Sequence, residues 1–464
     1  MFSWVTAALL YGCSGEPPAP AAPPAAPAVV AAVPPGPPRD VVFIVIDTLR
    51  ADVQRAADTP ILDALAAEGD QVDRAWSSGT WTVPSVISLF TGQSVRQHGW
   101  NYSFPRDMPE GRDTRFPPIP AELPTLAEVL SAAGFKTQGI YGNGSLRWKL
   151  GFDRGFESWE RCGDRKMPQC VAALTTAWKP TDRHFLYLHF LGPHQPLTPT
   201  AESRKRHGLV SSHFRKRGAL FMRAAEGGDK TVQELYRKTY RAVVEDTDAR
   251  VGRALEALGP FRAGAMVVVT SDHGDMMGEK DEWGHWHFVW EELTHVPLIA
   301  TRAGDLPDAM RNDTVADMIT STVGVAHDWP SKVADPLPLV TQREGKIALS
   351  ADGRWKGIWG EAALTEPGAP RMRRVEARPP DTGAVADPTR VTPPTAPAAV
   401  TSLVQVFDLR AEEPEGKRVS SQDEPLRAAR VAWEAASTAG TVTGTPVAAP
   451  EDAIEELRAL GYIE

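Results

Sequence analysis

The chain is poor in cysteine, with only three in 464 residues. So few cysteines exclude a small fold held together by several disulfides. Cys162 and Cys170 have no His/Cys set of zinc-finger spacing near them, and we therefore discount a structural zinc site. In an exported protein these two residues could close a disulfide, whereas in a cytosolic protein they would stay unpaired.

The chain also lacks a long apolar span after its N-terminal residues and a sustained run of basic residues. No stretch beyond the N-terminal residues is apolar for long enough to cross a bilayer. There is no sustained run of Lys and Arg, and the net charge is −9, so we expect no nucleic acid as a partner. The apolar share of 42% permits a packed core, and the length suits a large domain with a smaller companion.

The N-terminus has the pattern of a bacterial lipoprotein. Residues 1–13 contain a short apolar segment that ends at Cys13, which would become the lipidated first residue, although no Lys or Arg precedes the apolar stretch. Residues 14–39 consist largely of proline and alanine and predict a semi-rigid linker. We expect an exported protein, periplasmic or at the cell surface and attached to the membrane by lipid; the alternative is a disordered tail.

Apolar runs of strand length alternate with helical patterns after the linker. The predicted strands are 40–46, 135–141, 184–190, 265–270 and 296–300, and the predicted helices include 60–68, 125–133 and 232–258. This alternation predicts an α/β fold with a mostly parallel central sheet flanked by helices. We expect a catalytic domain at 40–335 and a smaller C-terminal α+β subdomain at 336–464, with a strand at 402–409, a loop at 360–399 and a helix at 452–460.

A hydroxyl stands at the start of another predicted helix. Thr82 lies just before this helix, Pro84 supplies the first helical position, and Gly92 can end it in the left-handed conformation. The unpaired N–H groups and the positive dipole end at a helix N-terminus favour a phosphate or sulfate group. Thr82 is therefore a candidate nucleophile for an anionic ester, although a Thr in this place is often only a cap.

Three other stretches place polar residues just after predicted strands. Asp47 follows the strand 40–46, His194 follows 184–190, and Asp272 and His273 follow 265–270. Sites in such sheets lie beyond the carboxyl ends of the strands, so we expect these residues to meet in one site. With Thr82, the residues Asp47, Asp272 and His273 make an O,O,O,N set for one divalent cation.

The cation would lower the pKa of the Thr82 hydroxyl and neutralise charge on the ester oxygens. The imidazole in the set favours Zn²⁺ or Mn²⁺, and Ca²⁺ or Mg²⁺, which prefer oxygen ligands, remain possible.

At these residues the sequence resembles the sulfatase family of the alkaline phosphatase superfamily, from about Asp40 to the C-terminus. The resemblance implies hydrolysis of sulfate or phosphate esters through a covalent intermediate, and an α/β catalytic domain followed by a smaller domain with a short antiparallel sheet. The stretches that carry it are 45–50, 82–92, 193–196, 271–274, 291–298, 406–410 and 457–462.

The sequence departs from the family pattern at the nucleophile, at one arginine, at one aspartate and at the Gly-Lys-Trp-His element. Sulfatases convert a Cys or Ser in Cys-x-Pro-Ser-Arg to formylglycine, but here Thr82 takes that position and Val86 replaces the Arg. The second Asp of the family's Asp-Asp pair is Thr48. The Gly-Lys-Trp-His element is not matched at its usual spacing, and residues 147–151 only echo it late. A Thr with an Asp-His pair is more similar to the phosphoryl-transferring branch, which includes lipoteichoic acid synthases, phosphoethanolamine transferases and nucleotide phosphodiesterases.

In that branch a further His follows the Asp-His pair and contacts a second metal or the substrate. His285 stands where it is expected, with His287 as its competitor, and both could instead be packing residues in a Trp-rich loop. His194 is a candidate phosphate contact or leaving-group acid.

Three hypotheses follow. The first is a metal-dependent hydrolase or transferase in which Thr82 attacks a phosphate or sulfate ester, phosphate being favoured, carried by a glycan, a lipid or a small molecule. The second is a true sulfatase that works without formylglycine. The third is a non-catalytic protein that binds anionic glycans or lipid headgroups.

Overall fold

The computed structural model describes residues 36–101, 115–147, 150–210, 220, 223–225, 228–285, 288–334, 338–343, 346–360, 403–410, 419, 422–437 and 447–448. The predicted signal segment with Cys13, nearly all of the linker, the loop 361–399 and the helix 452–460 lie outside these residues and stay predictions. Among the described helices, none combines the length and the apolar character that a bilayer crossing needs.

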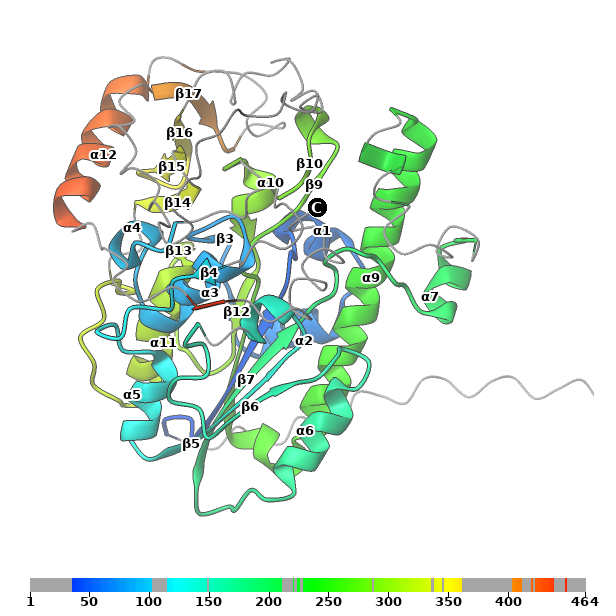
Figure 1. Ribbon diagram of the computed structural model, residues 1–464, viewed down its shortest axis with the longest axis vertical. Helices are drawn as coiled ribbons and strands as arrows, with labels where there is room; N and C mark the ends of the chain where they lie inside the picture. The colour runs from blue at the N-terminus through cyan, green and yellow to red at the C-terminus, as the bar shows by residue number, and fades with distance from the viewer. Residues whose placement is uncertain are drawn as a thin grey trace, which may run out of the picture. The chain divides into compact units, whose positions relative to one another are not determined.

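A seven-stranded sheet forms the centre of the fold, in the order β2-β12-β8-β1-β7-β5-β6. Figure 1 shows helices on either side of this sheet. Its middle strands are parallel, as predicted, and β12 alone is antiparallel to its two neighbours β8 and β2. The strands are β1 Asp40–Ile46, β2 Asp70–Gln71, β5 Phe135–Tyr141, β6 Ser158–Arg161, β7 Arg183–Phe190, β8 Ala265–Thr270 and β12 Leu298–Ala300.

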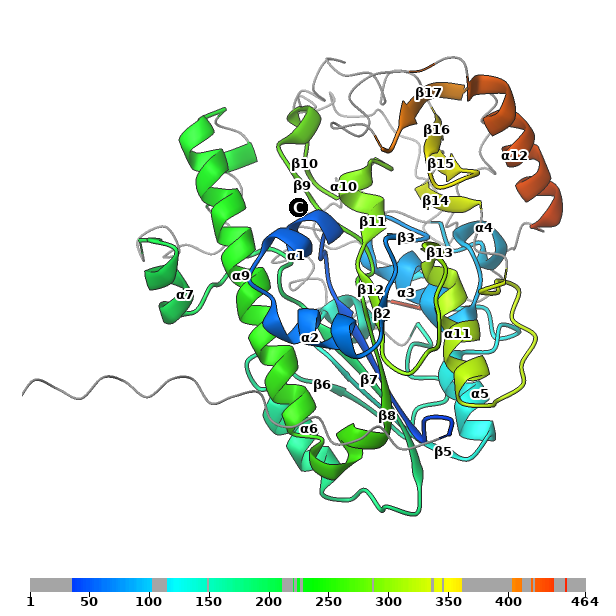
Figure 2. The ribbon, with the colours of Figure 1, turned by 180° about the vertical axis from the view of Figure 1, so that it is seen from behind.

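Helices cover both faces of this sheet, which explains why β1 is apolar along its whole length. Val41, Phe43 and Val45 face one layer, which contains α3 Thr82–Thr91, α5 Leu126–Ala132 and α11 Val315–Thr322. The alternate residues Val42, Ile44 and Ile46 face the other layer. This layer contains α1 Ala51–Ala56, α2 Pro60–Glu68, α6 Met167–Thr175 and the long α9 Lys230–Glu256. The view from behind shows α9 along the sheet (Figure 2).

Several predicted elements match closely, and two are corrected. The strands 40–46, 135–141 and 265–270 agree to the residue. Helix α3, however, begins at Thr82 itself with Trp81 as its N-cap, so Pro84 is its third residue rather than its first. The predicted strand 296–300 is divided at Pro297, which has no N–H for a ladder; the chain changes sheets there.

Short strands and helices complete the described part. Three small sheets join β9 Met276–Met277 with β10 Trp283–Gly284, β3 Arg74–Trp76 with β11 His295–Val296 and β13 Ala309–Arg311, and β4 Arg115–Phe116 with β18 Val447–Ala448. Further short helices are α4 Val95–His98, α7 Ala201–Arg206 and α10 Glu291–Thr294.

A separate antiparallel sheet lies toward the C-terminus, as the family resemblance implied. It orders β14 Leu339–Arg343, β15 Lys346–Ser350, β16 Trp355–Trp359 and β17 Leu403–Asp408, with α12 Asp423–Ala436 packed on it. The sequence pattern predicted only β17. The other strands were missed because each has five residues and buries polar side chains such as Thr341, Lys346 and Lys356, which break the apolar alternation.

This sheet contacts the segment that enters α3. The Thr341 hydroxyl donates to the carbonyl of Ser77, and the Gln342 N–H donates to the carbonyl of Ser78 at 2.9 Å. Lys356 of β16 is fully buried, 3.1 Å from Glu291 and 4.7 Å from the centre of the Trp76 ring. Burial alone would raise the pKa of Glu291, but the charge of Lys356 and its other cationic neighbours lowers it.

We expect Lys356→Met to lower the free energy of unfolding by about 3 to 5 kcal/mol, because it removes the closest cation from a buried carboxylate. The double variant Lys356→Met/Glu291→Gln should recover at least half of that loss. Lys136, in a half-exposed pair with Glu157 at 3.0 Å, is the matched control: Lys136→Met should cost less than about 1 kcal/mol. Urea unfolding measures all three, and equal costs for the two single variants would contradict the argument.

Candidate active site

Four neighbouring strands bring polar side chains to one edge of the sheet. In the order β8-β1-β7-β5, Asp272 and His273 follow β8, Asp47 follows β1, and His194 follows β7. Asn143 comes just after β5. Because parallel strands end at the same edge, residues more than 200 positions apart lie side by side, as the sequence analysis predicted for the first three strands.

Three of the predicted ligands form a compact group. One ligand atom each of Asp47, Asp272 and His273 lies within 4.8 Å of the others, and all three side chains have no exposed surface. The His273 Nε2 atom is 3.5 Å from Asp272 Oδ2 and 3.8 Å from Asp47 Oδ1. Such a group could hold a metal ion.

Hydrogen bonds divide the two oxygens of each carboxylate into different roles. Asp272 Oδ1 accepts the backbone N–H of Thr48 at 3.2 Å and of His273 at 2.9 Å. Asp47 Oδ2 accepts from Asn143 and, at 3.3 Å, from His189 Nε2. The opposite oxygens, Asp272 Oδ2 and Asp47 Oδ1, have no hydrogen-bond partner among the described residues and face the imidazole.

The imidazole presents a lone pair to these two oxygens. His273 Nδ1 is 2.8 Å from the Gly274 carbonyl, which can only accept, so we assign the ring proton to Nδ1. Nε2 then has no hydrogen to offer, and it too has no hydrogen-bond partner among the described residues. Three buried acceptor atoms that face one another are costly unless a cation lies among them, so the residues present fit a divalent metal.

The electrostatics of the group agree with this fit. Burial together with the charge of Asp47 raises the pKa of Asp272 to about 7. Burial alone would also raise the pKa of Asp47, but the nearby histidines, His194 first, lower it. Burial lowers the pKa of His273 to about 4, so its ring is neutral near pH 7, the form that binds metals.

Thr82 lies next to this group through a shared donor. The Asn143 Nδ2 atom is 2.5 Å from Asp47 Oδ2 and 3.2 Å from Thr82 Oγ1. Thr82 is fully buried at the N-terminal end of α3, where the helix dipole favours negative charge. The structure therefore brings all four predicted ligands into one place.

The predicted histidines His194 and His285 lie beside the group formed by Asp47, Asp272 and His273. The His285 ring centre is 4.5 Å from that of His273 and 5.1 Å from that of His194. His285 Nδ1 is 3.0 Å from Asp275 Oδ1, and burial lowers the pKa of His285 well below its usual value. The competing prediction, His287, lies outside the described residues.

The loop that carries His194 is held by a carboxylate inside a disulfide loop. Cys162 and Cys170 form the disulfide that the sequence left open. Asp164, between them, accepts the N–H groups of Leu191 and Gly192, each at 2.8 Å. These bonds fix the chain just before His194, whose Nδ1 lies 2.5 Å from the Gln195 carbonyl.

A cation from the C-terminal sheet contacts the residue that precedes Thr82. The Arg343 guanidinium of β14 stacks over the ring of Trp81, 5.0 Å from its centre, and Trp81 precedes Thr82 in the chain. The positive charge of Arg343 adds to the burial that lowers the pKa of His285.

Sequence analysis missed Asn143, His189 and Asp275. Asn143 was within reach, because it follows a correctly predicted strand by two residues, the same signal that identified Asp47. His189 was hidden inside a predicted strand, where a histidine usually packs. Its role becomes visible only through its contacts: Nδ1 lies 2.9 Å from the Tyr187 hydroxyl and Nε2 faces Asp47.

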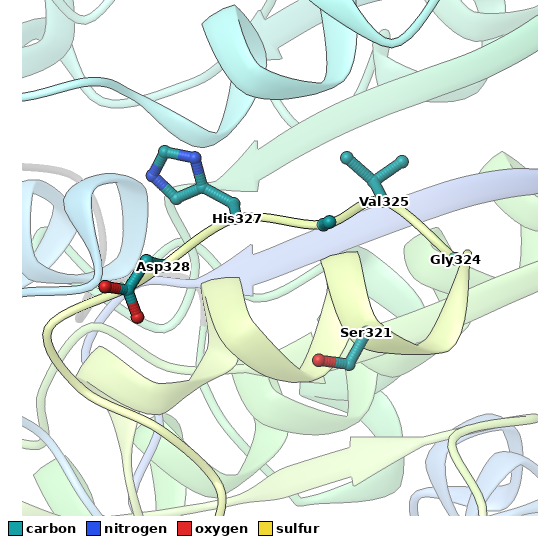
Figure 3. Close-up of a pocket in the computed structure, with 6 residues that line it drawn as sticks. Ser321, Gly324, Val325, His327 and Asp328 are labelled. Carbon is teal, nitrogen blue, oxygen red and sulfur yellow. The ribbon is translucent and has the colours of Figure 1, made fainter.

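A hollow elsewhere contains none of these residues. It has a volume of about 700 Å³ and is lined by Ser321, Gly324, Val325, Ala326, His327 and Asp328. Figure 3 shows Ser321 on α11 and Gly324, Val325, His327 and Asp328 on the loop that follows. We assign it no role in the chemistry.

Fold and site together define the chain as an α/β protein of the alkaline phosphatase-like class, with a carboxylate-histidine group at the edge of its sheet. Residues 39–330 match the Sulfatase family, and the chain belongs to that family.

Individual relatives match over shorter stretches. A sulfatase of Formosa agariphila is 33% identical over 85 residues, 18% of this chain and 16% of that protein. Iduronate 2-sulfatase of Homo sapiens is 38% identical over 82 residues, 17% of this chain and 15% of that protein. The chain thus spans about a sixth of the length of the curated relatives it matches.

Among solved structures, the phosphonate monoester hydrolase of Silicibacter pomeroyi is similar with a TM-score of 0.57. The comparison covers 85% of this chain and 94% of that one at 17% sequence identity, so the likeness concerns the fold.

Proposed function

We propose that this chain is a metal-dependent ester hydrolase in which Thr82 attacks the phosphorus of an anionic phosphoester. The single observation that carries the proposal is that Thr82 Oγ1 shares the Asn143 amide with Asp47, beside three buried acceptor atoms that face one another. A hydroxyl, a cation site and the positive end of a helix are then in one place, which is what phosphoryl transfer needs.

Asp47, Asp272 and His273 would hold the divalent cation, with Thr82 beside it. When bound, the cation would lower the pKa of the attacking hydroxyl and neutralise charge on the non-bridging oxygens of the ester. The neutral imidazole of His273 favours Zn²⁺ or Mn²⁺, while Ca²⁺ and Mg²⁺ are weaker candidates because they prefer oxygen ligands.

The protein's own residues account for the bond changes. A bond forms between Thr82 Oγ1 and phosphorus, and the bond from phosphorus to the leaving oxygen breaks in line with it. His194, close to His285, supplies the proton that the leaving oxygen takes up, and the proton that the Thr82 hydroxyl loses on attack passes to solvent, so the protons balance. His285, which burial keeps neutral, assists binding of the ester. Water then hydrolyses the phosphothreonine and regenerates the Thr82 hydroxyl.

The nucleophile favours phosphate over sulfate. Formylglycine releases sulfate from a hemiacetal-type intermediate, and a threonine sulfate has no such exit. Val86 also leaves the nucleophile helix without the family's arginine. The substrate class we propose is a phosphoester carried by a glycan, a lipid or a small molecule.

Matched aryl esters test the choice of ester. We expect kcat/KM for 4-nitrophenyl phosphate or bis(4-nitrophenyl) phosphate to exceed that for 4-nitrophenyl sulfate by at least about 100-fold, or about 2.7 kcal/mol of transition-state free energy. The leaving group is the same in all three, so the ratio reports the transferred group. A higher value for the sulfate would favour the second candidate, a sulfatase without formylglycine, which the sulfatase names of the matched relatives support.

The third hypothesis, a non-catalytic binding protein, has less support. A binding protein needs neither a buried hydroxyl beside a cation site nor two carboxylates with one oxygen each left for a metal. If the chain turned over none of the three esters with any divalent metal added, this third hypothesis would replace the first.

A further inference from the structure

We infer that Asn143 is a positioning residue that holds the nucleophile against the metal ligand Asp47; this inference rests on the proposed function of Thr82. Asn143 has no exposed surface and follows β5, the strand beside β7. Its amide touches both Thr82 and Asp47, which stand 35 positions apart in the sequence and on different elements.

The hydrogen bonds of Asn143 fix the direction of its amide. Asn143 Oδ1 accepts the N–H of Ser145 at 2.8 Å, so this atom is the oxygen and the opposite atom is the nitrogen. The two hydrogens of Nδ2 then point to Asp47 Oδ2 at 2.5 Å and to Thr82 Oγ1 at 3.2 Å. Both hydrogens are used, and a flipped amide would place two acceptors against each other.

The donor acts differently on its two partners. On Asp47 it occupies Oδ2, together with His189, and leaves Oδ1 for the cation. On Thr82 it makes the oxygen an acceptor, so the hydroxyl proton must point away from Asn143. As Thr82 gains negative charge on the way to attack, this hydrogen bond becomes charge-assisted and stronger, which stabilises the transition state more than the ground state.

We infer that the Asn143 amide takes over part of the role of the arginine that the family has on the nucleophile helix. The arginine of the nucleophile helix is replaced by Val86, so the helix itself supplies no positive side chain to orient the nucleophile. Asn143 supplies a neutral donor from β5 instead, and its role acts through Thr82 rather than by contact with the substrate.

A double-variant cycle with Thr82 tests this role. Asn143→Ala should lower kcat for an aryl phosphate by about 100-fold with KM changed by less than about 3-fold, because one donor to a developing charge is lost. In a Thr82→Ala background the same substitution should lower the remaining rate by less than about 3-fold, because its target is gone. Asn143→Asp, which keeps the volume and the acceptor for Ser145, should behave like Asn143→Ala.

Asn312 provides the matched control. It is another fully buried asparagine near the site, and its amide donates to the Ser271 carbonyl at 2.7 Å rather than to the nucleophile. Asn312→Ala should lower the rate by the same factor in both backgrounds, as a structural change does.

Each alternative outcome is distinct. Equal losses from Asn143→Ala in both backgrounds or full activity of Asn143→Asp would each overturn the inference. Undiminished turnover in Thr82→Ala alone would instead overturn the proposed function, and the positioning role with it.

Discussion

Thr82→Ala is expected to lower kcat for aryl phosphates by at least about 1,000-fold, because the variant has no group that can form the covalent intermediate. The fold should remain, since only a hydroxyl and a methyl group are removed from the start of α3. Metal should also remain bound, because Asp47, Asp272 and His273 are unchanged. Steady-state kinetics, thermal unfolding and elemental analysis of one preparation measure the three quantities.

Thr82→Ser is the control for this change. It keeps the oxygen that accepts from Asn143 and should retain turnover within about 30-fold of the parent protein. Intact-mass measurement after rapid quenching should show one phosphoryl group on the parent protein and none on Thr82→Ala. A phosphoryl group on Thr82→Ala would place the nucleophile elsewhere.

Removal of the metal is expected to abolish turnover and to lower the free energy of unfolding by about 4 kcal/mol relative to protein with metal at 1,000 times its dissociation constant. The physical reason is the pair of buried carboxylates. Without a cation, Asp47 and Asp272 face each other in a buried site, where burial and then the charge of Asp47 raise the pKa of Asp272 to about 7. Dialysis against a chelator, followed by Zn²⁺, Mn²⁺, Ca²⁺ or Mg²⁺, measures activity and the unfolding temperature.

Asp272→Asn extends this experiment, because its effect on the unfolding temperature should be opposite in chelated protein and in protein with metal. In chelated protein it removes one of two repelling carboxylates, so the variant should unfold at a higher temperature than the parent. With metal added, the variant should unfold at a lower temperature than the parent, because it has lost a charged ligand. If metal stabilised both proteins equally, or if chelated protein kept full turnover, Asp272 would not be a ligand.

Much of the central sheet could be predicted from the sequence because burial on both faces leaves an uninterrupted apolar run. The strand 40–46 is such a run, and its end at Asp47 marks the edge where polar groups gather. The same rule placed Asp272, His273 and His194. The strands β14 to β16 could not be predicted, since their buried polar residues are compensated by partners such as Glu291, 65 positions from Lys356. A local pattern contains no information about such partners.

The sequence alone determined the class of the fold, the residues at the strand ends and the presence of Thr82 where the family pattern has Cys or Ser, because each of these follows from local periodicity or from residue type. Only the tertiary structure decided which oxygen of each carboxylate is left for a cation, that His189 and Asn143 hold Asp47, and that one amide joins Asp47 to Thr82. These features depend on directions and distances between side chains from β1, β5, β7, β8 and α3. Such distances arise only when the sheet orders its strands, and no spacing along the chain encodes them.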